Sequence, residues 1–236
     1  MTAAGRNGRS STSAPNNCRR ADLDFLVGEW HHRFTLMDAD YSVELGANDD
    51  VLDFPWSAPE HNLRYYNLKN QPDLLLYISE ASEYQELGRY LAAVNSPASA
   101  LLTAKCDVWT DEELGEAEAI YDANTKLACY VDHLFASDSE TTEDARFNFE
   151  RHERFAQRVV ELLSRVPPIT AAIEVIIRRC YYRPDDSEER TGYYMTIYVS
   201  GYGSDVTDAR QRWAIALDLL QNVLLQLSAE VRRKAL

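Results

Sequence analysis

The C-terminal segment constrains the fold of this 236-residue chain more than any other. After the helix start predicted at Asp205-x-x-Asp208, large apolar residues recur at steps of three and four, the spacing of one face of an α-helix. They are Trp213, Leu217, Leu220, Leu224, Leu227 and Val231. The apolar residues Ile215, Leu219, Val223 and Leu225 widen this stripe to more than half of the helix circumference. Since such a helix is unstable in water, we expect a sheet or a second subunit to cover it.

Alternating apolar residues predict strands in the second half of the chain, over 101–109, 119–123, 127–135, 173–182 and 193–199. An earlier helix is predicted from the Thr141-x-x-Asp144 capping box to about residue 165, before Pro167-Pro168. Strand, strand and helix thus recur in two sub-repeats, 101–165 and 171–232. A ββα duplication and a shared preference at helix starts both explain this recurrence. The order of elements predicts an α+β fold, with an antiparallel sheet and helices packed on one face.

The first hundred residues are less regular. Residues 1–20 are rich in Ser, Asn, Gly and Arg and lack the apolar core of a secretory signal, so we expect a disordered leader before a single α+β domain over 21–236. A short helix ending near Gly28, followed by a strand, fits the next residues. The run Phe25-Leu26-Val27-Gly28-Glu29-Trp30 is similar to the opening of some small lipocalin-like β-barrel families. The helix-rich second half departs from a simple barrel, and the likeness assigns no functional residue.

Three further segments complete the expected architecture. Residues 38–55 are acidic and look like a loop, with a turn signal at Gly46-Ala47-Asn48-Asp49. Residues 63–68 are expected to form a short strand, and residues 74–94 a helix that ends before Asn95-Ser96-Pro97.

Charge and cysteine usage narrow the classes of partner. The net charge is −14, and residues 21–236 carry 20 basic against 38 acidic side chains. A body this acidic repels nucleic acid and anionic membranes, so any macromolecular partner is expected to be basic. No apolar run reaches the length of a membrane span. The four cysteines have neither zinc-ligand nor disulfide-framework spacing, which indicates a reducing, cytoplasmic location.

No motif predicts a metal, a cofactor or a known catalytic centre. His31 and His32 are adjacent, so their side chains diverge on a helix or a strand and cannot easily share a metal. His61, His133 and His152 stand in no metal-ligand frame. Gly201-Tyr202-Gly203 lacks the third glycine of a dinucleotide fingerprint and is interpreted as a tight turn.

The most distinctive feature is the combination of acidic runs and clustered tyrosines. One hairpin, over residues 173–199, joins both: an acidic loop lies between two tyrosine-rich strands. Its predicted partner-binding residues are Asp185, Asp186, Glu188, Glu189, Tyr182 and Tyr194. The competing interpretations are solvated acidic loops and tyrosines packed in a half-buried sheet.

Two functions fit the sequence. The first is a non-catalytic acidic protein that binds a basic protein partner, as a bacterial immunity protein neutralises a nuclease-type toxin. The alternative is an enzyme with a carboxylate and histidine site in a cleft between the two halves, because carboxylate catalysis leaves little local signature. A third possibility is an assembly factor that forms a homo-oligomer through its last helix.

Overall fold

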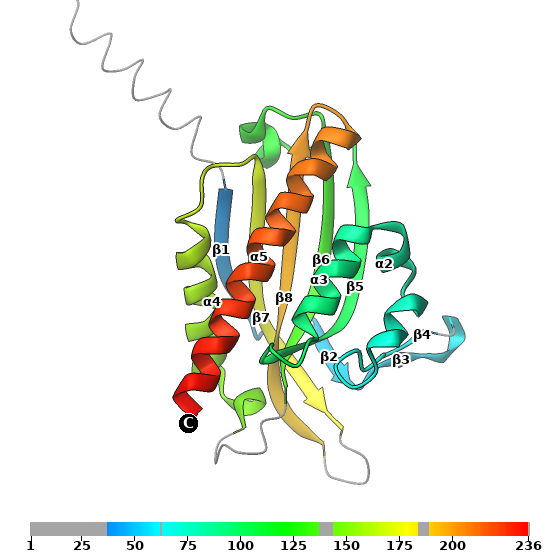
Figure 1. Ribbon diagram of the computed structural model, residues 1–236, viewed down its shortest axis with the longest axis vertical. Coiled ribbons are helices and arrows are strands. Elements are labelled where there is room, and N and C mark those ends of the chain that lie inside the picture. The colour runs from blue at the N-terminus through cyan, green and yellow to red at the C-terminus, as the bar shows by residue number, and fades with distance from the viewer. Residues whose placement is uncertain (1–36, 62, 137–143, 184–188, 236) are drawn as a thin grey trace, which may run out of the picture. The chain divides into compact units, whose positions relative to one another are not determined.

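The computed structural model describes residues 37–61, 63–136, 144–183 and 189–235 (Figure 1). Its largest element is a six-stranded sheet of β1 (Met37–Glu44), β2 (Val51–Phe54), β5 (Leu101–Asp111), β6 (Thr125–Phe135), β7 (Ala171–Tyr182) and β8 (Arg190–Gly203). The strand order is β1-β7-β8-β6-β5, and β2 continues beside β7 beyond the end of β1. A second sheet pairs the short strands β3 (Ser57–Ala58) and β4 (Leu63–Arg64).

The α+β prediction is confirmed, and the sheet is mixed. Strands β5 to β8 pair antiparallel, as expected, but β1 and β2 both pair parallel with β7. The helices are α2 (Ser79–Glu83), α3 (Gln85–Val94), α4 (Phe149–Leu163) and α5 (Val206–Ala235). Figure 1 shows α3, α4 and α5 on one side of the sheet, which agrees with the prediction that helices cover one face. Short 3-10 helices are η1 (Pro59–His61), η2 (Pro72–Tyr77), η3 (Glu116–Tyr121) and η4 (Ala145–Phe147).

Helix α5 lies across the sheet and forms the centre of the main core. Its predicted start is confirmed, because the Asp208 N–H donates to the Asp205 side chain at 2.9 Å. Trp213, Leu217 and Leu220 are buried against β6, β7 and β8. By length and composition the segment Val206–Arg232 could also cross a membrane; here its apolar stripe packs on the sheet.

Glycines in β8 bring that strand unusually close to α5. A Cβ atom on Gly201 would lie 2.3 Å from the backbone nitrogen of Trp213, and one on Gly203 would lie 2.3 Å from that of Ala209. The Gly201-Tyr202-Gly203 run therefore belongs to the strand and allows close helix packing, and it does not form the tight turn that we predicted.

Several expected elements differ in the first half. The supposed loop over 38–55 contains β1 and β2, although its turn at Gly46 is confirmed by the Asp49 N–H donating to the Gly46 carbonyl. Met37, Ala39 and Tyr41 pack on the main core, and the acidic residues between them point to the other face. We interpreted these acids as a loop, although their alternation with apolar residues is that of a half-buried strand. The parallel pairing of β1 with β7, more than a hundred residues away, cannot be predicted from the local sequence.

The other differences concern helices and short strands. The helix expected over 74–94 is broken into η2, α2 and α3, and the strand expected over 63–68 is limited to β4. Residues 119–123 were expected to be a strand, but η3 ends there. Asp144 caps η4 and not α4, whose N-cap is Asn148. Residues 1–36, which include the leader, His31-His32 and the barrel-like run, lie outside the described residues.

The predicted order of strand, strand and helix recurs as β5-β6-α4 and β7-β8-α5. Strands β6 and β8 pair, so the two sub-repeats form one continuous sheet and no cleft separates their described strands. The helices are not placed equivalently. Helix α5 packs on β6, β7 and β8, whereas α4 packs beside β1, β7, β8 and α5. The recurrence therefore describes the order of elements more closely than their arrangement.

Candidate functional site

Two of the predicted partner-binding residues lie in the interior. Tyr182 is 2% exposed and Tyr194 is 3% exposed, and both belong to a second apolar cluster with Leu52, Leu134 and Cys180. Phe54, Trp56 and Phe147 pack against this cluster, and the rings of Phe54 and Phe147 lie edge-to-face on Tyr182. The Tyr182 hydroxyl donates to the Tyr193 carbonyl at 2.9 Å. Both tyrosines thus have the surroundings expected from the competing interpretation, in which they pack within the sheet. A partner cannot contact these rings in this conformation.

The predicted acidic residues divide between described and undescribed positions. Glu189 is exposed and accepts a hydrogen bond of 2.9 Å from Arg183, whose guanidinium also lies 3.1 Å from Asp53. Asp185, Asp186 and Glu188 lie outside the described residues. In the described part of this loop, the charge of Glu189 is therefore partly neutralised by Arg183.

The face of the sheet opposite the helices carries a different acidic and aromatic surface. The register aligns one residue from each of five strands, and we name them the cross-strand row: Asp40, Glu174, Tyr198, Tyr130 and Asp107. Side chains alternate along a strand, and the neighbours of these residues pack on the helices, so the row points away from them. The three acids are exposed and the two tyrosines are half-buried, with ring centroids 5.9 Å apart.

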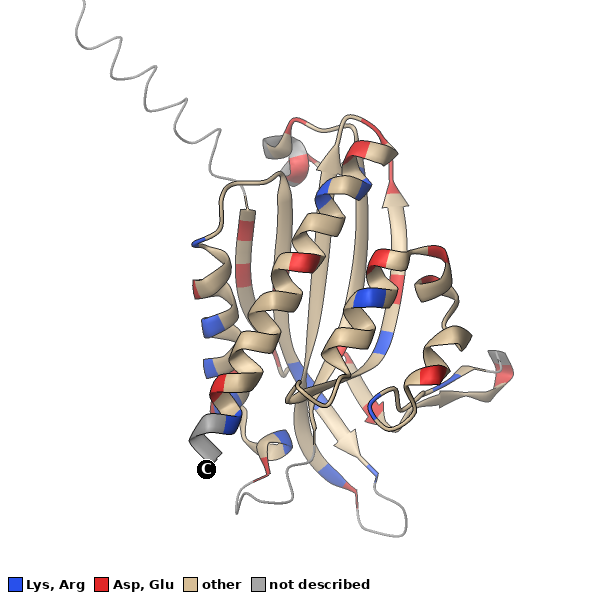
Figure 2. Ribbon diagram, viewed as in Figure 1, with Lys and Arg blue, Asp and Glu red and all other residues tan. Residues whose placement is uncertain are grey.

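The charge on this face is poorly balanced. Asp40 and Glu174 are directly opposite in the register, and like charges in that position destabilise a sheet. The pKa of Glu174 is raised, first because the surrounding sheet removes part of the water from its carboxyl and then because of the charges of Glu44 and Asp40. Figure 2 shows that β1 carries acidic positions along its length. Among the described residues, neither Asp40 nor Glu174 forms an ion pair.

The bases on this face already have partners. Arg178 donates to Glu44 at 2.8 Å, and Lys126 lies 2.9 Å from Asp111 and 2.8 Å from Glu118. Lys105 lies over the Trp56 ring. The β5 end of the row borders a groove of about 530 Å³, which Asp107 and Tyr130 help to line. A basic side chain of a partner could therefore contact acids of the row that have no ion-pair partner, close to aromatic rings and a groove.

Beside the row, a buried acid forms a polar network across three strands. The Thr196 hydroxyl donates to Asp132 at 2.7 Å, and Arg178 donates to the same hydroxyl oxygen at 3.2 Å. Asp132 is 4% exposed. Burial raises the pKa of its carboxyl to about 6, although Thr196, Lys105 and Arg178 oppose the shift. This carboxyl can take up or release a proton near neutral pH.

The buried histidines His133 and His152 do not share the environment of Asp132. His133 faces the helices, where its Nε2 atom lies 2.7 Å from the Tyr90 hydroxyl, and His152 donates from Nδ1 to the Asn148 carbonyl. Both are fully buried, and burial lowers the pKa of each to about 4. No group of three metal-ligating side chains occurs among the residues the structure describes. Neither histidine shares a cleft with an acid as the enzyme alternative requires.

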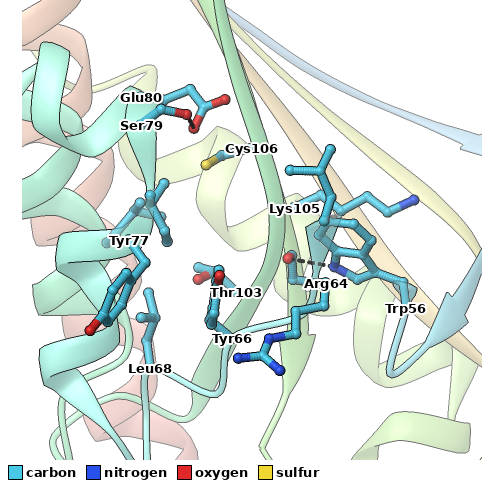
Figure 3. Close-up of a pocket in the computed structure, with 14 residues that line it drawn as sticks. Trp56, Arg64, Tyr66, Leu68, Tyr77, Ser79, Glu80, Thr103, Lys105 and Cys106 are labelled. Carbon is cyan, nitrogen blue, oxygen red and sulfur yellow. Dashed lines mark hydrogen bonds between the residues drawn. The ribbon is translucent and has the colours of Figure 1, made fainter. Parts of the chain in front are cut away.

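A separate aromatic pocket lies beside the outer edge of β5 (Figure 3). Its volume is about 140 Å³, and Trp56, Tyr66 and Tyr77 contribute to its walls. Glu80 and Cys106 lie at one end (Figure 3). Burial raises the pKa of the Cys106 thiol well above its ordinary value, so this cysteine is not an activated nucleophile.

No family model matches the chain, and neither a curated protein nor a solved structure matches it. The assignment of residues to the candidate site therefore depends only on the geometry of this structure. Sequence reasoning missed the cross-strand row because its members come from five strands, and only the register brings them together. The available signal was the acidic alternation of Asp38 and Asp40 between apolar residues, which marks a strand with one polar face.

Proposed function

We propose that this protein is a non-catalytic binding protein whose open sheet face takes a basic protein partner, in the manner of an immunity protein that neutralises a toxin. The proposal keeps the partner class expected from the acidic composition. It moves the contact from the residue 173–199 hairpin to the cross-strand row, because Tyr182 and Tyr194 are buried.

The observation that carries the proposal is that Asp40 and Glu174 are opposed on neighbouring strands and that neither forms an ion pair with a described residue. Two carboxylates in directly opposed positions repel each other, and no described base forms an ion pair with either one. A lysine or arginine from a partner would relieve that repulsion. Such complementarity steers association and excludes partners of the wrong charge.

The tyrosines of the row supply the other half of an interface. Tyr130 and Tyr198 are half-buried in the centre of the face, and Trp109 packs edge-to-face on Tyr198. Aromatic residues at the centre of an interface often contribute most of the binding energy, while charged residues at the rim govern the association rate. The row has this arrangement, with acids at both ends and rings between them.

The test uses the full chain as bait in an extract of its native source, with quantitative identification of the captured proteins. The double variant Asp40→Lys, Glu174→Lys should lose a basic partner. The matched control Asp218→Lys, Glu150→Lys changes two exposed acids on helices by the same charge and should retain it. With the purified partner, the association rate should fall steeply as salt shortens the screening length below about 10 Å.

Tyr198→Ala should instead speed dissociation, because a desolvated ring acts mainly on the lifetime of a complex. An acidic partner, or equal capture by both double variants, would show that the row is not the binding surface.

The enzyme alternative retains one specific observation, the proton-accepting carboxyl of Asp132. This group lies beside Lys105 and near the groove that Tyr130 lines, so a small substrate could reach its neighbourhood. A structure of the protein soaked with candidate metabolites would separate the two functions. Density within hydrogen-bond distance of Asp132 favours catalysis, and an empty groove favours the binding protein.

A further inference from the structure

The outer edge of β5 changes character along the strand. Near its start, side chains from other segments donate hydrogen bonds to the backbone carbonyls that point to the outer edge. Lys69 donates to the Leu101 carbonyl at 2.9 Å, and the Trp56 indole N–H donates to the Ala104 carbonyl at 2.8 Å. Such contacts block the pairing of an edge strand with another chain.

The second half of the edge lacks this protection. After the bulge that follows Thr103, the backbone N–H of Val108 points to the outer edge, where, among the described residues, it donates only to the side chain of its own neighbour Asp107, at 2.8 Å. An incoming strand must displace that exposed side chain to pair here. Alternation along the strand makes the backbone N–H and C=O groups of Cys106 and Thr110 point to the outer edge too. Within the described part of the chain, no other segment forms a backbone hydrogen bond with these three residues on that side.

An exposed apolar patch lies where the free edge begins. Tyr77 and Leu63, which line the aromatic pocket, are 70% and 54% exposed, and the adjacent Leu76 is 81% exposed. A contiguous exposed apolar surface is typical of an interaction site. The pocket volume of 140 Å³ suits a phenyl-sized group, since an apolar cavity of about 150 Å³ can hold benzene. Figure 3 shows Tyr77 on one side of the pocket and Trp56 on the other.

The far end of the same edge is acidic. Glu112 and Glu113 directly follow β5 and are exposed, and among the described residues they form no ion pair. The distance along the strand from the pocket at Cys106 to Glu112 is about 20 Å, at roughly 3.3 Å per residue. One extended segment of ordinary length could therefore contact both ends.

We propose that the outer edge of β5 binds an extended segment of a partner protein, in which basic residues precede an aromatic or large aliphatic residue by about six positions. The segment pairs antiparallel with residues 106–110. Its basic residues lie beside Glu112 and Glu113, and its apolar residue enters the pocket at Tyr77. This site uses residues other than the acids of Asp40 and Glu174, so each proposal can fail without the other.

The test measures binding of the full chain to a synthetic peptide, fluorescein-Lys-Thr-Lys-Thr-Val-Thr-Phe-Thr-amide, by fluorescence anisotropy. Binding in the micromolar range is expected. A peptide that is N-methylated on the alternate residues facing β5 should not bind, because it cannot donate to the strand. Replacing both lysines of the peptide by glutamate should weaken binding by roughly tenfold and reverse its dependence on salt, because salt then screens a repulsion.

Variants of the protein locate the site. Tyr77→Ser and Glu112→Lys should each weaken binding by roughly tenfold. The controls Ile215→Ser and Asp218→Lys change an exposed apolar residue and an exposed acid on α5, and they should leave binding unchanged. All four positions are exposed, so circular dichroism should show an intact fold.

Three outcomes would overturn the proposal. The first is no binding of the unmodified peptide, and the second is equal binding of the N-methylated peptide or of all four variants. The third is a dimer of the full chain in sedimentation that binds the peptide only after dissociation, because a second copy would then be the occupant of this edge.

Discussion

Asp132 is a carboxylic acid in a position that water hardly reaches. Its burial on the sheet face raises the pKa of the carboxyl to about 6, and the Thr196 hydroxyl and Arg178 stabilise the charged form only in part. The folded protein therefore holds this proton over a pH range in which the unfolded chain, with a carboxyl pKa of about 3.9, has released it. The contribution to stability is greatest below about pH 4 and falls as pH rises to about 6.

Asp132→Asn should raise the free energy of unfolding at pH 7 by up to about 3 kcal/mol, because the amide accepts the Thr196 hydrogen bond without a buried charge. The loss of stability between about pH 4 and pH 6 should also become smaller. Urea unfolding of both proteins across this range measures the change, with Asp107→Asn as an exposed acid on the same face. A variant less stable than the parent at pH 7 would mean that the charged form of Asp132 is needed by the network.

At the scale of elements, the contact between α5 and β8 organises the main core. It depends on the absence of a side chain at Gly201, where the strand approaches the helix backbone at Trp213. The Trp213 indole also reaches the Cys129 sulfur on β6, at 3.3 Å. The helix thus meets two strands, and a small displacement at Gly201 disturbs both contacts.

Gly201→Ala should lower the free energy of unfolding by roughly 3 kcal/mol, the upper part of the range for overpacking, because the atoms that its Cβ would meet belong to the backbone and cannot rotate away. Gly115→Ala is the matched control, since a Cβ there would meet only the Glu118 carboxylate, at 3.8 Å. Thermal and urea unfolding compare the two. A loss of equal size in both variants would contradict the close-packing explanation.

At the scale of the whole molecule, pairing between β6 and β8 makes the two sub-repeats into one sheet. Each sub-repeat alone would expose one side of this pairing, and β1 and β2 would still need β7. Helix α5 packs against β6 and β8, and the two strands come from different sub-repeats. The sheet of the described residues is therefore expected to unfold as one cooperative unit.

The calorimetric and van't Hoff enthalpies of unfolding should agree for the full chain, with one transition. The segments 101–165 and 171–232, expressed separately, should lack cooperative unfolding because their paired edges and core helices are exposed. Two separate transitions in the full chain, or a cooperatively folded isolated segment, would show that the sub-repeats are independent domains.

The features that the sequence determined by itself are local. The apolar stripe of α5, the alternation in β5 to β8 and the Asp205 cap follow from periods of two or three to four residues, which any one segment displays without reference to another. The acidic composition is also a property of the sequence alone, and the basic partner that it predicts stays a prediction.

Tertiary structure decided everything that depends on register between distant strands. It buried Tyr182 and Tyr194 in a second apolar cluster with Leu52, and it paired the acidic strand β1 parallel with β7. It also aligned Asp40, Glu174 and Tyr198 across three strands. Local periodicity reports which side of a strand is apolar, but it contains no information on which strand lies beside it. Residues separated by more than a hundred positions become neighbours only when the sheet forms.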